Sequence, residues 1–291
     1  MPRPEHRWTF EAIGTHWTLE SDTAFSDDVR TDVLDVCERF DAAWSRFRAD
    51  SVVSGLGRDG GEATMPAESS RLAALYRDLE RVTQGAMTPL VGVPLSRLGY
   101  DAGYRLHPDG PPVAAARWDD ALHWQGRALR LARGEILDIG AAGKGELVDQ
   151  VTDVLLSAGH RRFCVDGSGD LRVVGHREQP LRIALAKPGD AGLAVGVAEL
   201  AYGALCASAT DRRRWSEGLH HVLDGRTGTP VTEVQASWVV AESAMIADAM
   251  ATALFLSPAA PLRELAEFEY VRLFVNGQAE TSAGFPGKVL A

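Results

Sequence analysis

Four stretches of the chain carry apolar side chains three or four positions apart, which is the spacing of one helix face. They are residues 26–47, 68–83, 147–158 and 243–256. Ser26 or Asp27 can cap the start of the first predicted helix, and Ser243 can cap the start of the last. Gly85 and Gly159 lie just past the ends of the other two, where glycine commonly terminates a helix. The pattern therefore predicts four amphipathic or buried helices.

Alternating apolar and polar residues, bounded by turn residues, predict strands elsewhere in the chain. These segments are 10–20, 163–175, 181–186, 220–231, 236–242 and 269–277. Residues 90–112 are rich in Gly and Pro and predict a surface connector. Because helices and strands mix without a regular β-α-β rhythm, we expect an α+β fold with mixed or antiparallel sheets packed against helices. We expect residues 1–291 to form a single large domain.

The composition is that of an ordinary globular protein, with 45% hydrophobic and 24% charged residues. The formal net charge is −10 and the one basic cluster is "DRRRW" at 211–215, so nucleic-acid binding is disfavoured. No run of about 18 apolar residues is present, so we expect no membrane insertion. Three cysteines stand far apart without a C-x-x-C pair, which indicates a reducing compartment, and we expect the cytoplasm.

The segment "DIGAAGKGELVDQ", residues 138–150, has the glycines of a phosphate-binding loop. A P-loop needs a glycine five positions before its Gly-Lys pair and a hydroxyl residue after it, but Asp138 and Gly145 stand at these positions. Residues 166–175 do not match the dinucleotide pattern G-x-G-x-x-G either, since Arg172 replaces the third glycine. The two commonest nucleotide-binding motifs are therefore excluded.

The predicted helix at 243–256 carries two polar residues among apolar and small ones. Asp248 and Thr252 are four positions apart and therefore lie on one face. A carboxylate in such surroundings is costly unless it is paired or binds a cation. It either caps a neighbouring loop or binds a hard cation such as Mg²⁺. His220 and His221 precede a turn, where a histidine is either structural or a positioned general base.

Seven segments together resemble one family, the FAD:protein FMN transferases of the ApbE type, over about residues 8–285. They are "IGT" (13–15), "WSRFRADSVVSGLGR" (44–58), "GAMTPLVG" (85–92), "DIGAAGKGELVD" (138–149), "VDGSGDLRVVG" (165–175), "HHVLDGRTGTPV" (220–231) and "SAMIADAMATAL" (243–254). The fourth resembles the family signature D-L-G-G-x-A-K-G-x-x-V-D. The resemblance implies Mg²⁺-dependent transfer of FMN from FAD to a threonine of a target flavoprotein, with release of AMP. It also implies two lobes with the flavin site in the cleft between them.

The resemblance further implies which residues form the site. Those implied to bind FAD are Ile13, Gly14, Thr15, Phe47, Ser51, Gly143, Lys144, Asp170, Ser208 and His221. Asp248, Thr252 and the carbonyl of Gly143 are implied to bind Mg²⁺. His221 and Asp248 are the implied catalytic residues, with His221 taking the proton of the attacking hydroxyl. Helical spacing alone places Phe47 on the core face of the first predicted helix.

Several positions differ from the family pattern. They are Ile13 for methionine, Gly57 for asparagine, Thr88 for aspartate, Asp166 and Ser168 for asparagine and glycine, Gly225 for proline, and "CASA" (206–209) for A-T-S-G. The metal-binding face and His221 are retained. Three interpretations follow: an FMN transferase acting on a flavoprotein, a metal-dependent FAD pyrophosphatase that yields FMN and AMP, and a non-catalytic FAD-binding or carrier protein.

Overall fold

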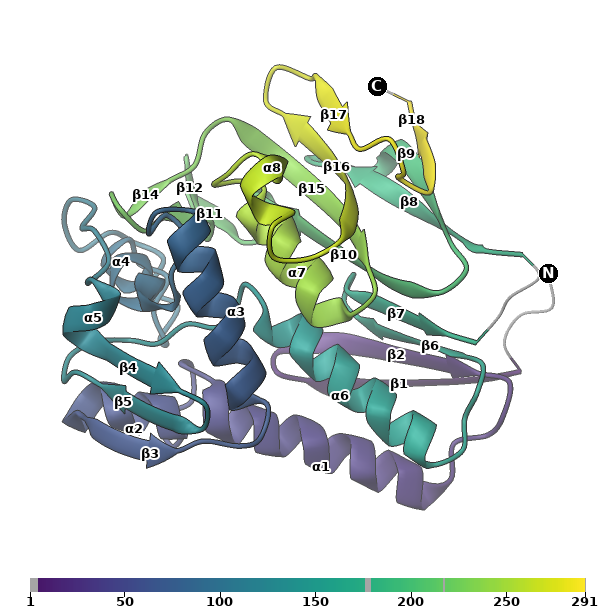
Figure 1. The fold of residues 1–291 in the computed structure, drawn as a ribbon, viewed down its shortest axis with the longest axis horizontal. Coiled ribbons are helices and arrows are strands. Elements are labelled where there is room, and N and C mark those ends of the chain that lie inside the picture. The colour runs from purple at the N-terminus through teal and green to yellow at the C-terminus, as the bar shows by residue number, and fades with distance from the viewer. Residues whose placement is uncertain (1–4, 176–178, 217, 291) are drawn as a thin grey trace.

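An eight-stranded sheet forms the centre of the computed structural model, which describes residues 5–175, 179–216 and 218–290 (Figure 1). In spatial order its strands are β1 (His6–Ala12), β2 (Thr15–Ser21), β6 (Phe163–Gly167), β7 (Leu171–Val174), β10 (Gly203–Ala209), β15 (Val234–Ala241), β16 (Phe268–Phe274) and β17 (Ala279–Thr281). Each neighbouring pair is antiparallel. The two ends of the expected domain, residues 1–4 and 291, lie outside the described residues.

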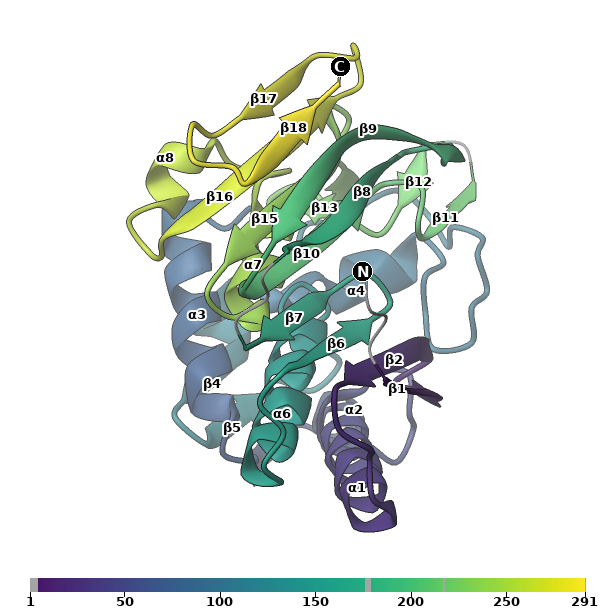
Figure 2. The same ribbon diagram turned by 90° about the vertical axis from the view of Figure 1, so that its right-hand side faces the viewer.

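Helices cover one face of this sheet. They are α1 (Asp27–Trp44), α3 (Ser69–Val82), α6 (Gly143–Ser157) and α7 (Ala244–Ala253) (Figures 1 and 2). Their apolar stripes meet the sheet in the larger hydrophobic core, which includes Phe40, Leu147 and Met250 from the helices and Trp17 from β2. Burial of these stripes is the main stabilising contribution to this layer.

A smaller sheet lies against the other face. Its order is β18 (Gly287–Val289), β9 (Asp190–Leu200) and β8 (Leu181–Lys187), again antiparallel (Figure 2). Leu185 packs with Leu205 and Trp238 of the large sheet in a second core. The large sheet is therefore covered on both faces, and the described sheets are antiparallel throughout, as the α+β prediction requires.

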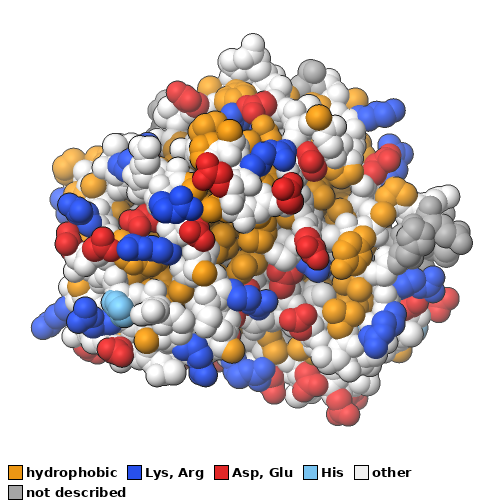
Figure 3. Space-filling view, viewed as in Figure 1, with side chains coloured by type: hydrophobic (Ala, Val, Ile, Leu, Met, Phe, Trp, Pro, Cys, Tyr) orange, Lys and Arg blue, Asp and Glu red, His pale blue; other side chains and the backbone are white. Residues whose placement is uncertain are grey.

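The remaining elements are short. They are β3 (Gly61–Thr64), β5 (Ala128–Leu131) and β4 (Leu122–Gln125) in a third sheet, the pairs β11 (Arg214–Ser216) with β12 (Leu219–His220) and β13 (Leu223–Asp224) with β14 (Thr229–Pro230), and the helices α2 (Val52–Asp59), η1 (Pro89–Val91), α4 (Gly92–Arg97), α5 (Trp118–Ala121) and α8 (Ala259–Leu262). Acidic and basic side chains are interspersed on the face shown in Figure 3. No helix among the described residues is long and apolar enough to cross a membrane.

The four predicted helices are confirmed, with two corrections that affect the site. α1 ends at Trp44, so Phe47 lies in the turn beyond it and not on its core face. α6 begins at Gly143, so the end of the expected glycine-rich loop is already the first turn of a helix. The predicted connector at 90–112 is also partly wrong, because η1 and α4 occupy residues 89–97. Ser26 and Ser243 cap α1 and α7, each accepting a backbone N–H three residues on.

Candidate functional site

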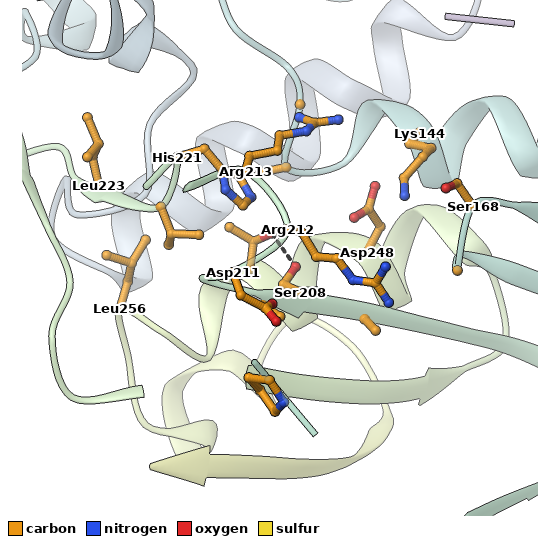
Figure 4. Close-up of a pocket in the computed structure, with 18 of the residues that line it drawn as sticks. Lys144, Ser168, Ser208, Asp211, Arg212, Arg213, His221, Leu223, Asp248 and Leu256 are labelled. Carbon is orange, nitrogen blue, oxygen red and sulfur yellow. Dashed lines mark hydrogen bonds between the residues drawn. The ribbon is translucent and has the colours of Figure 1, made fainter. Parts of the chain in front are cut away.

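A cavity of about 690 Å³ lies where β10, α6 and α7 come together with the turn between β8 and β9 (Figure 4). Six of the residues predicted to form the site line it: Thr15, Lys144, Ser208, His221, Asp248 and Thr252. They come from five separate parts of the chain, so the fold and not local sequence brings them together. A concave site with convergent polar groups is the usual form of a small-molecule site.

Asp248 is held by the start of α6. Its carboxylate accepts a hydrogen bond of 2.9 Å from the backbone N–H of Gly145. This N–H belongs to the first turn of α6, where the backbone donors have no partner within the helix and favour negative charge. A Cβ at position 145 would overlap the carbonyl oxygen of Ala244. Glycine is therefore required here for the close approach of α6 and α7.

Two further contacts fix α7. Asp149 of α6 accepts hydrogen bonds from the N–H groups of Ala244 and Met245, at 3.0 and 2.9 Å. Farther along the helix, Ser237 of β15 donates to the carbonyl of Ala251. Both ends of α7 are thus tied to the scaffold, which sets the position of the two polar residues on its face.

Lys144 and two buried carboxylates form a charged group at the cavity wall. The ammonium of Lys144 lies 2.9 Å from the carboxylate of Asp170, which is fully buried. Burial disfavours the charged ammonium, but the charges of Asp170 and Asp248 outweigh it and raise the pKa of Lys144. Burial and the charge of Asp170 raise the pKa of Asp248 well above its usual range. Two buried carboxylates beside a single ammonium would carry an excess of negative charge when both are ionised. A bound cation would compensate that excess.

The donor set fits a hard cation such as Mg²⁺. The hydroxyls of Ser208 and Thr252 lie 3.1 Å apart, next to the face that carries Asp248. Oδ1 of Asp170 is buried and makes no hydrogen bond to any described residue. In the described parts of the chain, no group of three or more His, Cys, Asp or Glu is placed so that it could hold a metal ion by itself. Mg²⁺ commonly takes one carboxylate and completes its shell with substrate phosphate oxygens.

His221 faces the cavity as a neutral imidazole (Figure 4). Burial, together with the positive charge of Arg213, lowers its pKa to about 3. Nδ1 of His221 is buried and makes no hydrogen bond among the described residues. The residue nevertheless lines the cavity, and the unprotonated nitrogen of a neutral imidazole can accept a proton from a substrate hydroxyl. The preceding His220 instead bonds to the carbonyl of Val231 at 3.0 Å, a structural role.

Four predicted site residues do not line the cavity although they lie near it in the chain or in space. Ile13 and Gly14 form the turn between β1 and β2, both with positive φ, of 46° and 70°. Gly143 is the first residue of α6. Asp170 is fully buried and reaches the site only through its ion pair with Lys144.

Phe47 and Ser51 also lie outside the cavity lining. The ring of Phe47 stacks on Tyr104, with 5.3 Å between the ring centroids, and lies beside Tyr100, which does line the cavity. Ser51 caps α2 by accepting the N–H of Ser54, and its hydroxyl donates to a backbone carbonyl. The contacts of Ser51 account for its burial without a ligand.

One ion pair at the cavity was not predicted from the sequence. The guanidinium of Arg46 lies 2.5 Å from the carboxylate of Asp138, which lines the cavity. Burial alone would raise the pKa of Asp138, but Arg46 and the N–H of Gly140 outweigh it and lower the pKa. The position of Arg213 beside His221 was not predicted either. From the sequence, the basic cluster at 211–215 bears only on nucleic-acid binding.

Two departures from the family pattern have a local explanation. A side chain at Gly57 would overlap the backbone carbonyl of Glu135. A Cβ at Gly225 would lie 2.7 Å from the methyl group of Thr88 and 2.8 Å from the carbonyl of Gly85. The backbone is therefore closely packed at both positions. The asparagine and the proline of the family pattern would not fit there without a shift of the neighbouring atoms.

A sequence profile of the ApbE family matches residues 13–274. The chain belongs to the ApbE family. Two similar curated proteins are both named FAD:protein FMN transferase. The one from Treponema pallidum is 27% identical over 292 residues, covering 89% of this chain and 80% of its own length. The one from Vibrio cholerae is 26% identical over 250 residues, covering 80% of this chain and 74% of its own length.

Solved ApbE structures have the same fold. The flavin transferase ApbE from Vibrio cholerae aligns with a TM-score of 0.78 at 22% identity, covering 98% of this chain and 99% of its own. The ApbE protein from Thermotoga maritima aligns with a TM-score of 0.77 at 21% identity, covering 96% and 97%. The α+β fold predicted from the order of helices and strands is therefore confirmed.

Proposed function

We propose that this ApbE-family chain transfers the FMN half of FAD to a threonine hydroxyl of an acceptor flavoprotein and releases AMP. The observation that carries the proposal is the meeting, in one cavity, of the Asp248 carboxylate, the Lys144 ammonium and the neutral imidazole of His221. A negative pyrophosphate, an attacking hydroxyl and a departing phosphate need this combination of charge, positioning and proton acceptance.

The proposed step breaks one bond and forms one. The acceptor oxygen bonds to the phosphorus of the FMN half, the bond from that phosphorus to the bridging oxygen breaks, and AMP leaves with that oxygen. The hydroxyl proton moves to the unprotonated ring nitrogen of His221, which lines the cavity. Because His221 is neutral in the structure, it is in the protonation state that a general base requires.

The chain's own residues position the pyrophosphate. Lys144 supplies a positive charge, and its ion pair with Asp170 fixes the position of the ammonium group. Asp248 and Thr252, which line the cavity, would hold Mg²⁺, which when bound neutralises charge on the pyrophosphate oxygens. The Gly143 carbonyl, the third ligand that the resemblance implies, belongs to the first residue of α6 and is outside the cavity lining. The hydroxyls of Ser208 and Thr252 line the cavity together with Asp248 and can donate hydrogen bonds to substrate oxygens.

The acceptor in this proposal is a flavoprotein whose threonine hydroxyl enters the cavity to reach His221. A reducing compartment such as the cytoplasm is proposed for the chain itself, supported by the wide separation of its three cysteines.

The test is to incubate the purified chain with FAD and Mg²⁺, with and without a flavoprotein that carries an acceptor threonine. Chromatography follows AMP and FMN, and mass spectrometry follows the acceptor. The proposal predicts AMP release together with an acceptor heavier by one FMN, and no gain for an acceptor whose threonine is changed to valine. Release of AMP with all FMN free would indicate the pyrophosphatase instead. Bound FAD that stays intact with every acceptor would indicate the carrier.

A further inference from the structure

We propose that Arg212 and Arg213, in the loop after β10, bind the pyrophosphate of FAD and act together with Lys144. This inference rests on the proposed function, because it takes FAD as the ligand of the cavity. The two arginines belong to the basic cluster at 211–215, which has no ligand in the proposed function.

Both arginines line the cavity, and neither guanidinium makes a hydrogen bond or an ion pair with any described residue. Some other charged groups at the cavity have partners, whereas Lys187, Asp190 and Asp211, which also line it, form no ion pair with a described residue. Lys144 pairs with Asp170, and Asp138 pairs with Arg46. The charge of Arg213 acts on Asp138 and Asp248 and favours their charged forms. In a chain with a net charge of −10, adjacent cations that face a cavity without a hydrogen-bonded partner indicate an anionic ligand.

The loop that carries the two arginines is anchored on both sides. Before them, the carboxylate of Asp211 accepts the N–H of Gly189, in the β8–β9 turn, at 2.8 Å. After them, the indole N–H of Trp215 donates to the carbonyl of Leu98 at 3.0 Å. Figure 4 shows Arg213 beside His221, in agreement with the effect of its charge on that ring. The backbone is therefore fixed while the side chains are free to close on a ligand.

The chemistry favours phosphate over the other parts of FAD. A guanidinium presents a planar set of donors that matches phosphate oxygens, whereas the flavin and adenine rings are neutral. The charge of Arg213 also contributes to the low pKa of His221, which places it close to the proposed base. An anion bound at Arg213 would offset that charge at the moment when His221 accepts a proton.

The test compares Arg212→Gln and Arg213→Gln with the matched control Arg214→Gln. Arg214 is the next residue but does not line the cavity, and its Nε bonds to the carbonyl of Ser216 at 3.3 Å. Calorimetric titration of each full-length variant with FAD, ADP and riboflavin gives the affinities. We expect about tenfold weaker binding of FAD and ADP for either cavity variant, since one charge-assisted contact is lost. Riboflavin binding and the control should match the unmodified chain.

The inference is overturned if both cavity variants bind FAD and ADP as tightly as the control does. It is also overturned if riboflavin weakens in parallel, because the loss would then not concern phosphate. Normal FAD affinity with a raised KM for the acceptor would assign the arginines to an acidic acceptor segment instead. Failure of the unmodified chain to bind FAD would overturn the proposed function as well, whereas the other outcomes leave that function standing.

Discussion

The backbone N–H of Gly145 lies 2.9 Å from the carboxylate of Asp248, although 103 positions separate them in the chain. The contact joins the first turn of α6 to the middle of α7 and places the buried acid at the cavity. The glycine after Lys144 is thus required for helix contact. Its neighbour Lys144 points its charge at the cavity from the same turn.

Gly145→Ala should destabilise the fold and the site together. The added methyl group would overlap the Ala244 carbonyl, so α6 and α7 must separate. We expect a loss of about 1–3 kcal/mol in the free energy of unfolding, typical of overpacking, measured by urea denaturation. Gly55→Ala in α2 is the matched control, because only the far end of Arg58 comes near its Cβ. The control should gain a few tenths to about 1 kcal/mol from helix propensity. Equal stability of the two variants would show that the close approach is not required.

Glu146 gives the fold a pH dependence that can be isolated. It is fully buried, lies 2.5 Å from Arg71, and burial raises its pKa to about 7. A carboxyl whose folded pKa exceeds its unfolded pKa binds a proton more readily when folded. Its contribution to stability is therefore largest in acid and is lost as the pH rises through about 7.

The comparison with Glu146→Gln removes this titration. Relative to that variant, the unmodified chain should gain about 2 kcal/mol in the free energy of unfolding between pH 8 and pH 5. Urea denaturation at both values measures it. Parallel pH curves for the two proteins would show that the buried carboxyl does not titrate in this range.

The helices were predictable from sequence for a local reason. α1 and α7 combine a serine cap with apolar residues at helical spacing, so cap and stripe point to the same boundaries. The start of α6 was not predictable, because its first turn holds Gly143 and Gly145, which local propensity disfavours in a helix. The tertiary contact with α7 overrides that preference.

The strand β9 was missed for a similar reason. Its sequence, "DAGLAVGVAEL", interrupts the apolar alternation with Gly192 and Gly196. Gly196 is needed where β18 pairs closely, since a Cβ there would lie 2.6 Å from the carbonyl of Lys288. Likewise, no sequence pattern joins Asp138 to Arg46 or Arg213 to His221. These pairs form only because distant segments of the chain come together in the fold, and no local sequence pattern predicts that arrangement.

His221→Ala should abolish turnover and leave FAD binding nearly intact. Removal of a general base typically costs about 10²- to 10⁴-fold in rate, while the charged groups that face the pyrophosphate remain. The rate of AMP release with an acceptor present, set beside the affinity for FAD, separates the two effects. His123→Gln is the control, since His123 is exposed on β4, outside this cavity. A His221→Ala enzyme with normal turnover would remove this residue from the mechanism.

The pH profile of the unmodified enzyme gives an independent test of His221. Burial, Arg213 and His220 lower its pKa, Asp138 opposes them, and the result is about 3. The base is therefore active above that value, so the acid limb of kcat/KM due to His221 should lie well below the usual histidine pKa of about 6.5. An acid limb near 6.5 that disappears in His221→Ala would contradict the buried, neutral state of the ring.

The most direct measurement of the central claim is the Mg²⁺ dependence of AMP release from FAD, with an acceptor flavoprotein present, in the unmodified chain and in Asp248→Asn. Asparagine keeps the size of the side chain and an oxygen that can accept the Gly145 N–H, but it removes the charge. The account predicts that the unmodified chain releases AMP with Mg²⁺ and stops in EDTA. It also predicts that Asp248→Asn, still folded by urea denaturation, loses at least about 100-fold in rate at the same Mg²⁺ concentration. The same Mg²⁺ dependence and rate in both proteins would contradict the account.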